Sequence, residues 1–234
     1  MKNTNDCIAC ERDICTVKHV YSGAALAEFS KKKTQSWYKK GEFIVREGDP
    51  IHGIFFLQEG KTKIFSSSIS GAQQIVRLCS SGESLCFRGY GRKNYISSVM
   101  ALEDSFVCFF SNEDLMPIFS TPELSMMLIK YLGDELEVAE RRLKYLMQMN
   151  VREKVAEALL FMKKSFGVNE KNELNVYMSR EDIAAIAGTS QELVIRQLSE
   201  FEKDKYIDRR EHKNIALLNE KVLQDMVSKY HVFT

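Results

Sequence analysis

The sequence predicts an α+β fold in which many short strands are followed by a long helix and then by a small helical domain. Three features carry this prediction. Short runs of β-branched and aromatic residues recur between glycines from Trp37 to Phe110. An apolar pattern of helical period then extends from about Pro122 to about Asn150. The segment 179–198 has the caps and spacing of two short helices joined by a tight turn.

The first region predicts an antiparallel β-barrel or sandwich. Glycines at positions 41, 48, 53, 60, 71 and 82 separate its apolar runs, and regular turns between short strands are typical of such folds. A short helix is expected before it, from Ala24 to Lys33. The expected strands are 43–45, 54–57, 62–65, 74–78 and 105–110.

The long helix carries a heptad seam, because its apolar residues step alternately by three and four. The seam consists of Ile129, Leu132, Leu136, Ala139, Leu143 and Leu146. The next step falls on Asn150, and a polar Asn on a seam can fix the register and favour two strands. The pattern therefore predicts a dimerisation helix, with a core helix packed on its own β-domain as the alternative.

The two short helices have clear local signals. Ser179 is a good N-cap, and Asp182 follows three residues later, where a carboxylate faces free backbone donors. Gly188 falls at the turn, a position that can require a left-handed backbone. Thr189 or Ser190 can cap the second helix.

The second helix has an apolar face and a polar face. Leu193, Val194 and Leu198 are expected to point inward. An outward set of this kind can meet base edges in a DNA major groove, whereas an ordinary helical hairpin with a solvated face is the alternative. The outward residues are Gln191, Glu192, Ile195 and Arg196.

Two apolar stretches flank the polar run 209–214, which predicts a two-stranded wing after the helical pair. With its wing, this region resembles the C-terminal winged helix-turn-helix of the CRP/FNR regulators, which are bacterial transcription factors. Glu192 and Arg196 match the family's Glu-x-x-x-Arg. The strings KKGEFIVREGD (39–49) and IFFLQEGKTKIF (54–65) resemble the opening of the family's cyclic-nucleotide-binding-type β-roll.

The resemblance covers nearly the whole chain and implies its organisation. The expected parts are a cysteine-containing segment (1–20), a double-stranded β-helix or jelly-roll sensor (21–121), a dimerisation helix (122–150) and a winged helix-turn-helix domain (151–234). Arg196 would bond to guanine, and Glu192 would accept from a cytosine amino group. Ile195 departs from the small or hydroxylated residue expected there in the family; it would contact a thymine methyl, so the operator would differ. The remaining expected DNA contacts are Ser179, Arg180, Thr189, Ser190, Gln191, Arg209 and Lys213.

Three of the six cysteines, Cys7, Cys10 and Cys15, lie within nine residues. Thiolates are soft ligands that suit zinc or an iron–sulfur cluster, although the three can also be free thiols. In the FNR branch, a cysteine at the end of a segment like 101–108 is the fourth ligand of a [4Fe-4S] cluster. The resemblance thus implies that Cys108 is the fourth ligand, with Cys79 and Cys86 as alternatives. The spacing C-x2-C-x4-C is one residue shorter than the best known FNR pattern. A site that holds zinc, or no metal, is therefore an open alternative.

A cyclic nucleotide is not the expected effector. Binders of this fold carry Gly-Glu-Leu and then an Arg-Ser/Thr-Ala segment that holds the phosphate. Here Gly82-Glu83-Ser84-Leu85 matches the first part only partly. The second part falls near Tyr95 to Ser98, where no arginine stands in the key place, although Arg88, Arg92 and Lys93 are close by. A regulator without metal, sensing a small molecule in the β-roll, is therefore a second hypothesis.

Composition and sequence patterns limit the other classes of function and location that the chain can have. A net charge of +1 shows no overall basic footprint, so DNA affinity has to come from local cations and from dimerisation. The sequence contains no long apolar run and no signal peptide, and a cytoplasmic location is expected. It has no phosphate-cradling glycine loop and no nucleophile–base set, so an enzyme is not expected. The expected partners are promoter DNA, RNA polymerase and a second copy of the chain; a dimeric ligand-binding module without DNA binding is the alternative.

Overall fold

The computed structural model describes residues 6–12, 15, 17–18, 23–69, 71–85, 93–119, 122–209 and 214–230. The chain forms two compact units. The first comprises Met1–Ser66 and Arg77–Glu135, and the second comprises Ser67–Val76 and Leu136–Thr234. The functional boundaries expected from the sequence stay predictions. No helix among the described residues is long and apolar enough to cross a membrane.

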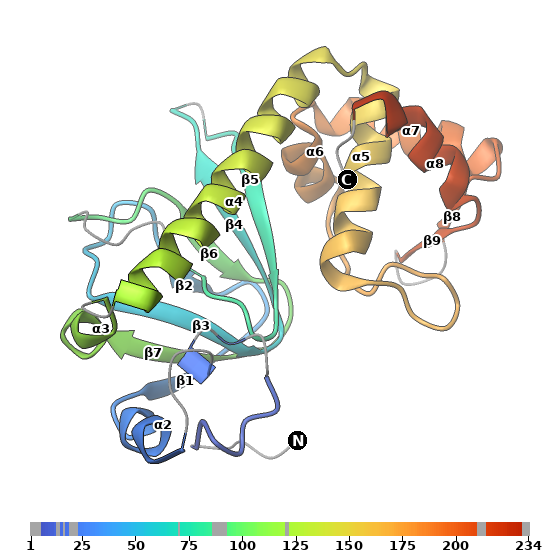
Figure 1. The fold of residues 1–234 in the computed structure, drawn as a ribbon. Helices are drawn as coiled ribbons and strands as arrows, with labels where there is room; N and C mark the ends of the chain where they lie inside the picture. The colour runs from blue at the N-terminus through green and yellow to red at the C-terminus, as the bar shows by residue number, and fades with distance from the viewer. Residues whose placement is uncertain are drawn as a thin grey trace. The chain divides into compact units, whose positions relative to one another are not determined.

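The short strands form two antiparallel sheets, as predicted (Figure 1). The sheets lie in the first unit except for residues 67 and 73–76, which belong to the second. One sheet has the strand order β1-β7-β3, formed by Thr34–Tyr38, Ser105–Ser111 and Gly53–Glu59. The other has the order β2-β6-β4-β5, formed by Phe43–Val45, Ser98–Ala101, Lys61–Ser67 and Gln73–Ser80. All five predicted strands are confirmed, while β1 and β6 were not predicted.

The alternation of side chains along β3 separates two core clusters. Phe56 joins Phe110 and Cys108 on one face, and Leu57 joins Val107 and Cys79 on the other. Helix α2 (Gly23–Ser30) covers the first cluster, where Phe29 stacks on Phe110 with ring centroids 4.5 Å apart. The helix ends three residues before the predicted Lys33, because the chain turns there into β1.

Helix α3 (Asn112–Phe119) precedes the long helix α4 (Pro122–Gln148). The predicted seam on α4 is open in the single chain: Ile129 is 60% exposed, Leu136 59% and Leu143 65%. Ala139 is exposed as well, and only Leu146 is half-buried among the last four seam positions. A core helix would bury these side chains, so the exposed seam favours the predicted dimerisation helix over a core helix.

The expected role of Asn150 on the seam is wrong. Helix α4 ends at Gln148, and Asn150 is the N-cap of the next helix, α5 (Val151–Phe166). The Asn150 side chain accepts from the backbone N–H of Glu153, and Glu153 accepts from the backbone N–H of Asn150. This capping box starts a new helix at the point where the heptad spacing only appeared to continue.

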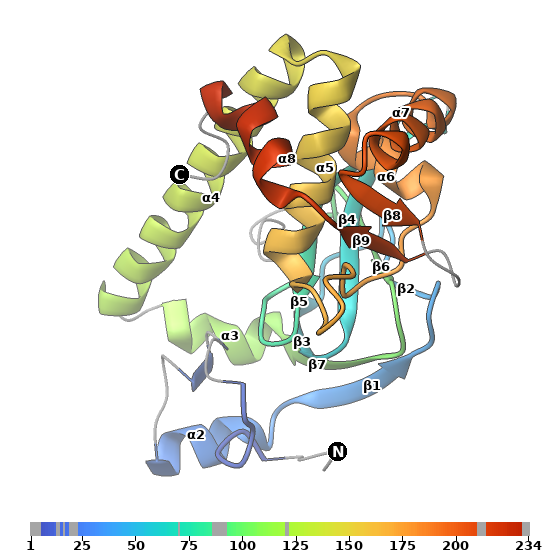
Figure 2. The ribbon, with the colours of Figure 1, turned by 90° about the vertical axis from the view of Figure 1, so that its right-hand side faces the viewer.

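The second unit contains the expected helix-turn-helix and wing (Figure 2). Helix α5 packs against α6, α7 and α8, and the closing helix α8 ends in a 3-10 turn, η3. The strands β8 and β9 form a two-stranded antiparallel sheet. The bounds are Arg180–Ala187 for α6, Gln191–Lys203 for α7, Ile207–Arg209 for β8, Ile215–Leu217 for β9, Glu220–Val227 for α8 and Ser228–Tyr230 for η3.

Candidate functional site

Helix α6 begins with the predicted capping box. The backbone N–H of Asp182 donates to Ser179 Oγ at 3.0 Å, and the backbone N–H of Ser179 donates to Asp182 Oδ2 at 3.0 Å. Both donors would otherwise lack a partner at the helix start. The apolar face of α6 is buried as expected, with Ile183 and Ile186 fully enclosed.

The turn between the helices is set by Gly188 in the left-handed conformation, with φ 60° and ψ 47°. A side chain at this backbone position is strained, so the glycine fixes where α6 stops. Ser190 then caps α7, because its side chain accepts from the backbone N–H of Leu193 at 3.3 Å. Of the two predicted caps, Ser190 is therefore confirmed.

Helix α7 presents the predicted polar face to solvent. Val194 and Leu198 are fully buried and Leu193 is half-buried, and the opposite face of the helix is exposed to solvent. Ile195 is 44% exposed. The exposed residues at its start and centre are Gln191, Glu192, Ile195 and Arg196. Sequence reasoning missed Gln197, which is buried with its amide nitrogen unpaired among the described residues.

The wing cation Arg209 is engaged within the unit. Its Nε donates to Glu202 Oε2 on α7 at 2.8 Å, and its backbone N–H donates to Glu202 Oε1 at 3.1 Å. The bond with Arg209 lowers the pKa of Glu202, and burial together with Arg209 lowers the pKa of Arg180. Arg180 and Arg209 are thus neighbouring cations around one carboxylate. Lys213, also an expected DNA contact, lies outside the described residues.

The last turn of α6 is held by residues that the sequence did not single out. Arg142 of α4 donates from Nη2 to the Ile186 carbonyl at 2.9 Å, and Gln74 of β5 donates to the Ala185 carbonyl at 2.7 Å. The Arg142 Nε also donates to Glu157 Oε1 of α5 at 3.2 Å. Burial raises the pKa of Glu157, and Arg142 opposes this shift. One buried cation therefore connects α4, α5 and α6.

The four predicted metal ligands line one cavity in the first unit. Cys7, Cys10 and Cys15 come from the N-terminal segment, and Cys108 comes from β7. Cys7 and Cys108 belong to the same core cluster, and Cys15 packs against it. The structure thus brings together residues that are about a hundred positions apart in the sequence, as the four-thiolate hypothesis requires.

Cations surround these sulfurs. Arg12, Lys18 and Lys33 line the same cavity, and Lys33 Nζ donates to Cys7 Sγ at 3.4 Å. Lys18 Nζ donates to the Cys10 carbonyl at 2.7 Å. Four thiolates would concentrate negative charge here, and nearby cations favour the charged form of the ligands.

As protonated thiols, Cys15 and Cys108 are weaker acids than a free cysteine. Burial raises the pKa of Cys15, and it raises the pKa of Cys108 to about 11. Gln35 donates to Cys108 Sγ at 3.4 Å, and the Cys108 thiol donates to Gln58 Oε1 at 3.2 Å. Metal binding requires deprotonation, so these values belong to the metal-free thiols.

The alternative fourth ligands have different positions. Cys79 is fully buried in the second core cluster, away from the lining of the cysteine cavity, and burial raises its pKa to about 12. Cys86 lies outside the described residues. No three His, Cys, Asp or Glu side chains in the described ranges converge closely enough to hold a single metal ion.

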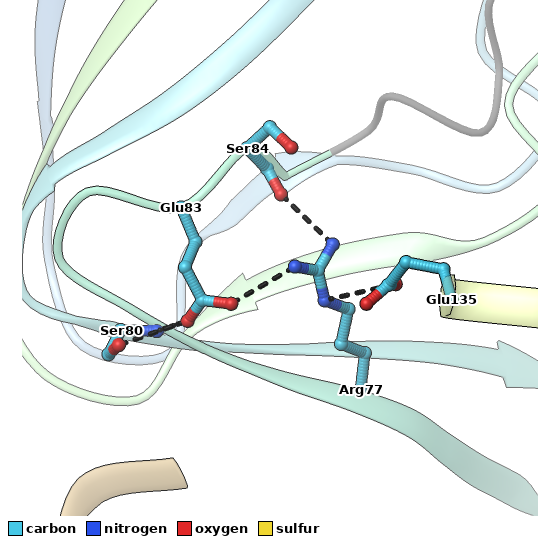
Figure 3. Close-up of polar contacts among 5 residues, drawn as sticks. All are labelled: Arg77, Ser80, Glu83, Ser84 and Glu135. Carbon is cyan, nitrogen blue, oxygen red and sulfur yellow. Dashed lines mark hydrogen bonds and ion pairs between the residues drawn. The ribbon is translucent and has the colours of Figure 1, made fainter. Parts of the chain in front are cut away.

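The β-roll glutamate expected near a cyclic nucleotide is already bonded to the protein (Figure 3). Arg77 donates from Nη2 to Glu83 Oε1 at 3.0 Å, and the backbone N–H of Ser80 donates to Glu83 Oε2 at 2.6 Å. The other side of the Arg77 guanidinium pairs with Glu135 of α4 at 3.7 Å. A ligand at Glu83 would have to displace these groups.

Comparisons with known proteins agree with both halves of this arrangement. Residues 35–121 match the family model of the cyclic nucleotide-binding domain, and residues 153–226 match that of the Crp-like helix-turn-helix domain. Electron transport regulator A of Shewanella oneidensis is 27% identical over 190 residues, covering 77% of this chain and 76% of that protein. The transcriptional activator protein Anr of Pseudomonas aeruginosa is 27% identical over 184 residues, covering 77% and 75%.

Among solved structures, FixK2 from Bradyrhizobium japonicum shares the fold, with a TM-score of 0.73 at 22% identity over 83% of this chain and 96% of that chain. The fold and the helix-turn-helix surface therefore define a sequence-specific DNA-binding transcription regulator. The chain belongs to the CRP/FNR family. The family is dimeric.

Proposed function

We propose that this regulator responds to oxygen or nitric oxide through a [4Fe-4S] cluster held by Cys7, Cys10, Cys15 and Cys108. The observation that carries the proposal is the shared cavity, which these four cysteines line together with three cations. The names of the relatives agree, since they include an electron transport regulator and an anaerobic regulatory protein. When bound, such a cluster supplies an oxygen-sensitive link between the N-terminal segment and the β-roll.

The donor set suits a cluster, because four cysteine thiolates are the usual ligands of a [4Fe-4S] cluster. Four thiolates also suit zinc, and the test below distinguishes the two metals. The cavity has a volume of about 30 Å³, so the N-terminal segment has to move outward to admit a cluster.

The signal has a short route to the dimerisation helix. Tyr131 of α4 packs against the core cluster that contains Cys7 and Cys108. Movement of the N-terminal segment would therefore change the packing of Tyr131, which lies one residue before seam position Leu132 on α4. We propose that α4 forms the homodimer through its exposed seam, and that the dimer places two α7 helices on the two half-sites of promoter DNA.

The contacts of α7 with DNA follow from its exposed face. Arg196 is exposed and makes no ion pair within the described part of the chain, so it is available for a guanine edge. Glu192, four residues earlier, accepts from a cytosine amino group. Such a regulator acts in the cytoplasm with RNA polymerase as its partner, and we assign it no enzymatic activity.

The test uses protein purified without oxygen. Iron, acid-labile sulfide and visible absorption are measured for wild type, Cys108→Ser and Cys79→Ser. We expect about four iron and four sulfide per chain in wild type and in Cys79→Ser, because Cys79 lies outside the cavity. Cys108→Ser should not retain the cluster. Zinc in place of iron, or full retention by Cys108→Ser, would contradict the assignment.

A second candidate is a metal-free regulator that senses a small molecule. It is favoured by a pocket of about 400 Å³ in the β-roll, which is of ligand size. Its lining includes Asp49 and His52 beside the rings of Phe55, Tyr95 and Phe109. This candidate predicts DNA binding that is indifferent to iron and oxygen, and that changes when the pocket is filled by Ile44→Trp.

A further inference from the structure

Gln58 has an unusual position beside Cys108. It lies in β3 two residues after Phe56, which is the register partner of Cys108 on β7. The pairing of the two strands shifts between Leu57 and Glu59, so Gln58 lies at a β-bulge. Bulges re-aim side chains and are frequent next to functional sites. Here the bulged residue lines the cysteine cavity and accepts from the Cys108 thiol at 3.2 Å.

A second amide holds the same sulfur from the other neighbouring strand. Gln35 is the register partner of Cys108 on β1, and its side-chain nitrogen donates to Cys108 Sγ at 3.4 Å and also to Gln58 Oε1. The Gln35 amide oxygen is buried without a partner among the described residues. A buried unpaired acceptor costs stability, so this pair of amides is not explained by the stability of the β-roll.

The backbone of Gln58 also contacts the N-terminal cysteine segment. Arg12, which lies between Cys10 and Cys15, donates from Nε to the Gln58 carbonyl at 2.9 Å. One residue therefore meets the β-roll cysteine with its side chain and the N-terminal cysteine segment with its carbonyl.

We propose that Gln58 and Gln35 are positioning residues for the cluster, and that they set how firmly it is retained. This inference rests on the proposed function. Cluster binding removes the Cys108 proton, so Gln58 then has to present its amide N–H to the thiolate, as Gln35 already does. In that arrangement the two amides orient Cys108, and the Gln58 carbonyl registers the N-terminal segment through Arg12. Groups that bond to metal ligands typically change metal affinity by about 10–100-fold when removed. N–H donors to sulfur also stabilise the more negative, reduced form of a bound cluster.

The test compares Gln58→Leu and Gln35→Leu with wild type and with the matched control Gln224→Leu. Gln224 lies in α8, bonds to Glu220 on an exposed surface and does not line the cavity. Gln58→Leu removes the amide but keeps the carbonyl that Arg12 uses. Each protein is reconstituted without oxygen from ferrous iron and sulfide, and then titrated with EDTA while bound iron is measured.

We expect both cavity variants to lose half of their iron at about tenfold lower EDTA than wild type, with unchanged melting of the β-roll. Gln35→Leu should also shift the midpoint potential to a more negative value, an effect that a purely structural role would not produce. Gln224→Leu should match wild type in both measurements. If the wild type takes up iron and both cavity variants lose it at the same EDTA concentration as the wild type, only the positioning role is overturned. A wild type that takes up no iron would overturn the cluster and this inference together.

Discussion

Arg142→Met tests how the helix-turn-helix is held within its compact unit. The Arg142 side chain is only 12% exposed, and its partner Glu157 is 1% exposed. Methionine keeps a long apolar stem beside Phe161, whose ring lies 4.2 Å from the guanidinium carbon. The substitution removes the charge and leaves the Glu157 carboxylate and the Ile186 carbonyl without this donor.

The structure predicts a large loss of stability. Breaking a buried ion pair by removing one partner costs about 3–5 kcal/mol, because the remaining charge stays buried. We therefore expect the free energy of unfolding to fall by about 4 kcal/mol. Removing Glu157 as well should restore part of this loss, since an apolar pair carries no buried charge. Arg142→Met/Glu157→Leu should remain about 1–2 kcal/mol below wild type, because the Ile186 carbonyl still lacks its donor.

The assay is urea unfolding at fixed protein concentration, followed by two probes. Far-UV circular dichroism follows the helices, and fluorescence of the single tryptophan, Trp37 of β1, follows the first unit. The matched control is Arg141→Met, since Arg141 pairs with Glu137 at an exposed i,i+4 position. Such surface pairs contribute about 0–1 kcal/mol, so the control should stay near wild type.

The effect should depend on pH. Burial raises the pKa of Glu157 above its ordinary value, and loss of Arg142 raises it further. Between the unfolded and the folded pKa, the folded state binds more protons than the unfolded state, so stability falls as pH rises. Arg142→Met should thus be closer to wild type near pH 5 than at pH 8. An equal loss of stability for Arg141→Met and Arg142→Met, or a loss that grows toward low pH, would contradict this role of Arg142.

Three further predictions concern DNA binding and its control. Arg196→Ala should weaken binding by about 1–3 kcal/mol and relax base preference at one position, measured by selection from randomised duplexes; a uniform loss across all sequences would contradict its role. Ser179→Ala should lower the stability of the second unit by about 1 kcal/mol in urea unfolding, because α6 loses its capping box; an unchanged midpoint would show that the cap is dispensable. Tyr131→Ala should keep iron and sulfide content but reduce the response of DNA affinity to oxygen, measured by fluorescence anisotropy, and a full response would exclude this route.

The features that were predicted from the sequence depend on local signals. Ser179, Asp182 and Gly188 define α6 through groups within ten residues, and the structure has the same caps and turn. The strands with β-branched or aromatic residues between glycines were found for the same reason. The strand β1 begins with Thr34, Gln35 and Ser36, whose polar side chains gave no strand pattern, although pairing with β7 makes them a strand.

The features that were not predicted depend on contacts between distant segments. The pairing of Arg142 with Glu157 and the bulge at Gln58 arise only when separate elements meet. Asn150 shows a related limit, because a residue that caps a new helix can fall on the spacing of the preceding one. Cys7, Cys10 and Cys15 were grouped by their spacing, and Cys108 was added through family resemblance; all four line one cavity.

In this regulator, the proposed cysteine site controls DNA binding. A DNA duplex is first selected for binding to protein that was prepared without oxygen. The most direct measurement is the affinity for this duplex by fluorescence anisotropy, at one fixed salt concentration, before and after the protein is exposed to air. We predict at least about a tenfold loss of affinity for wild type, or 1.4 kcal/mol, and no change for Cys108→Ser. Equal affinity of the wild type before and after exposure would contradict the claim.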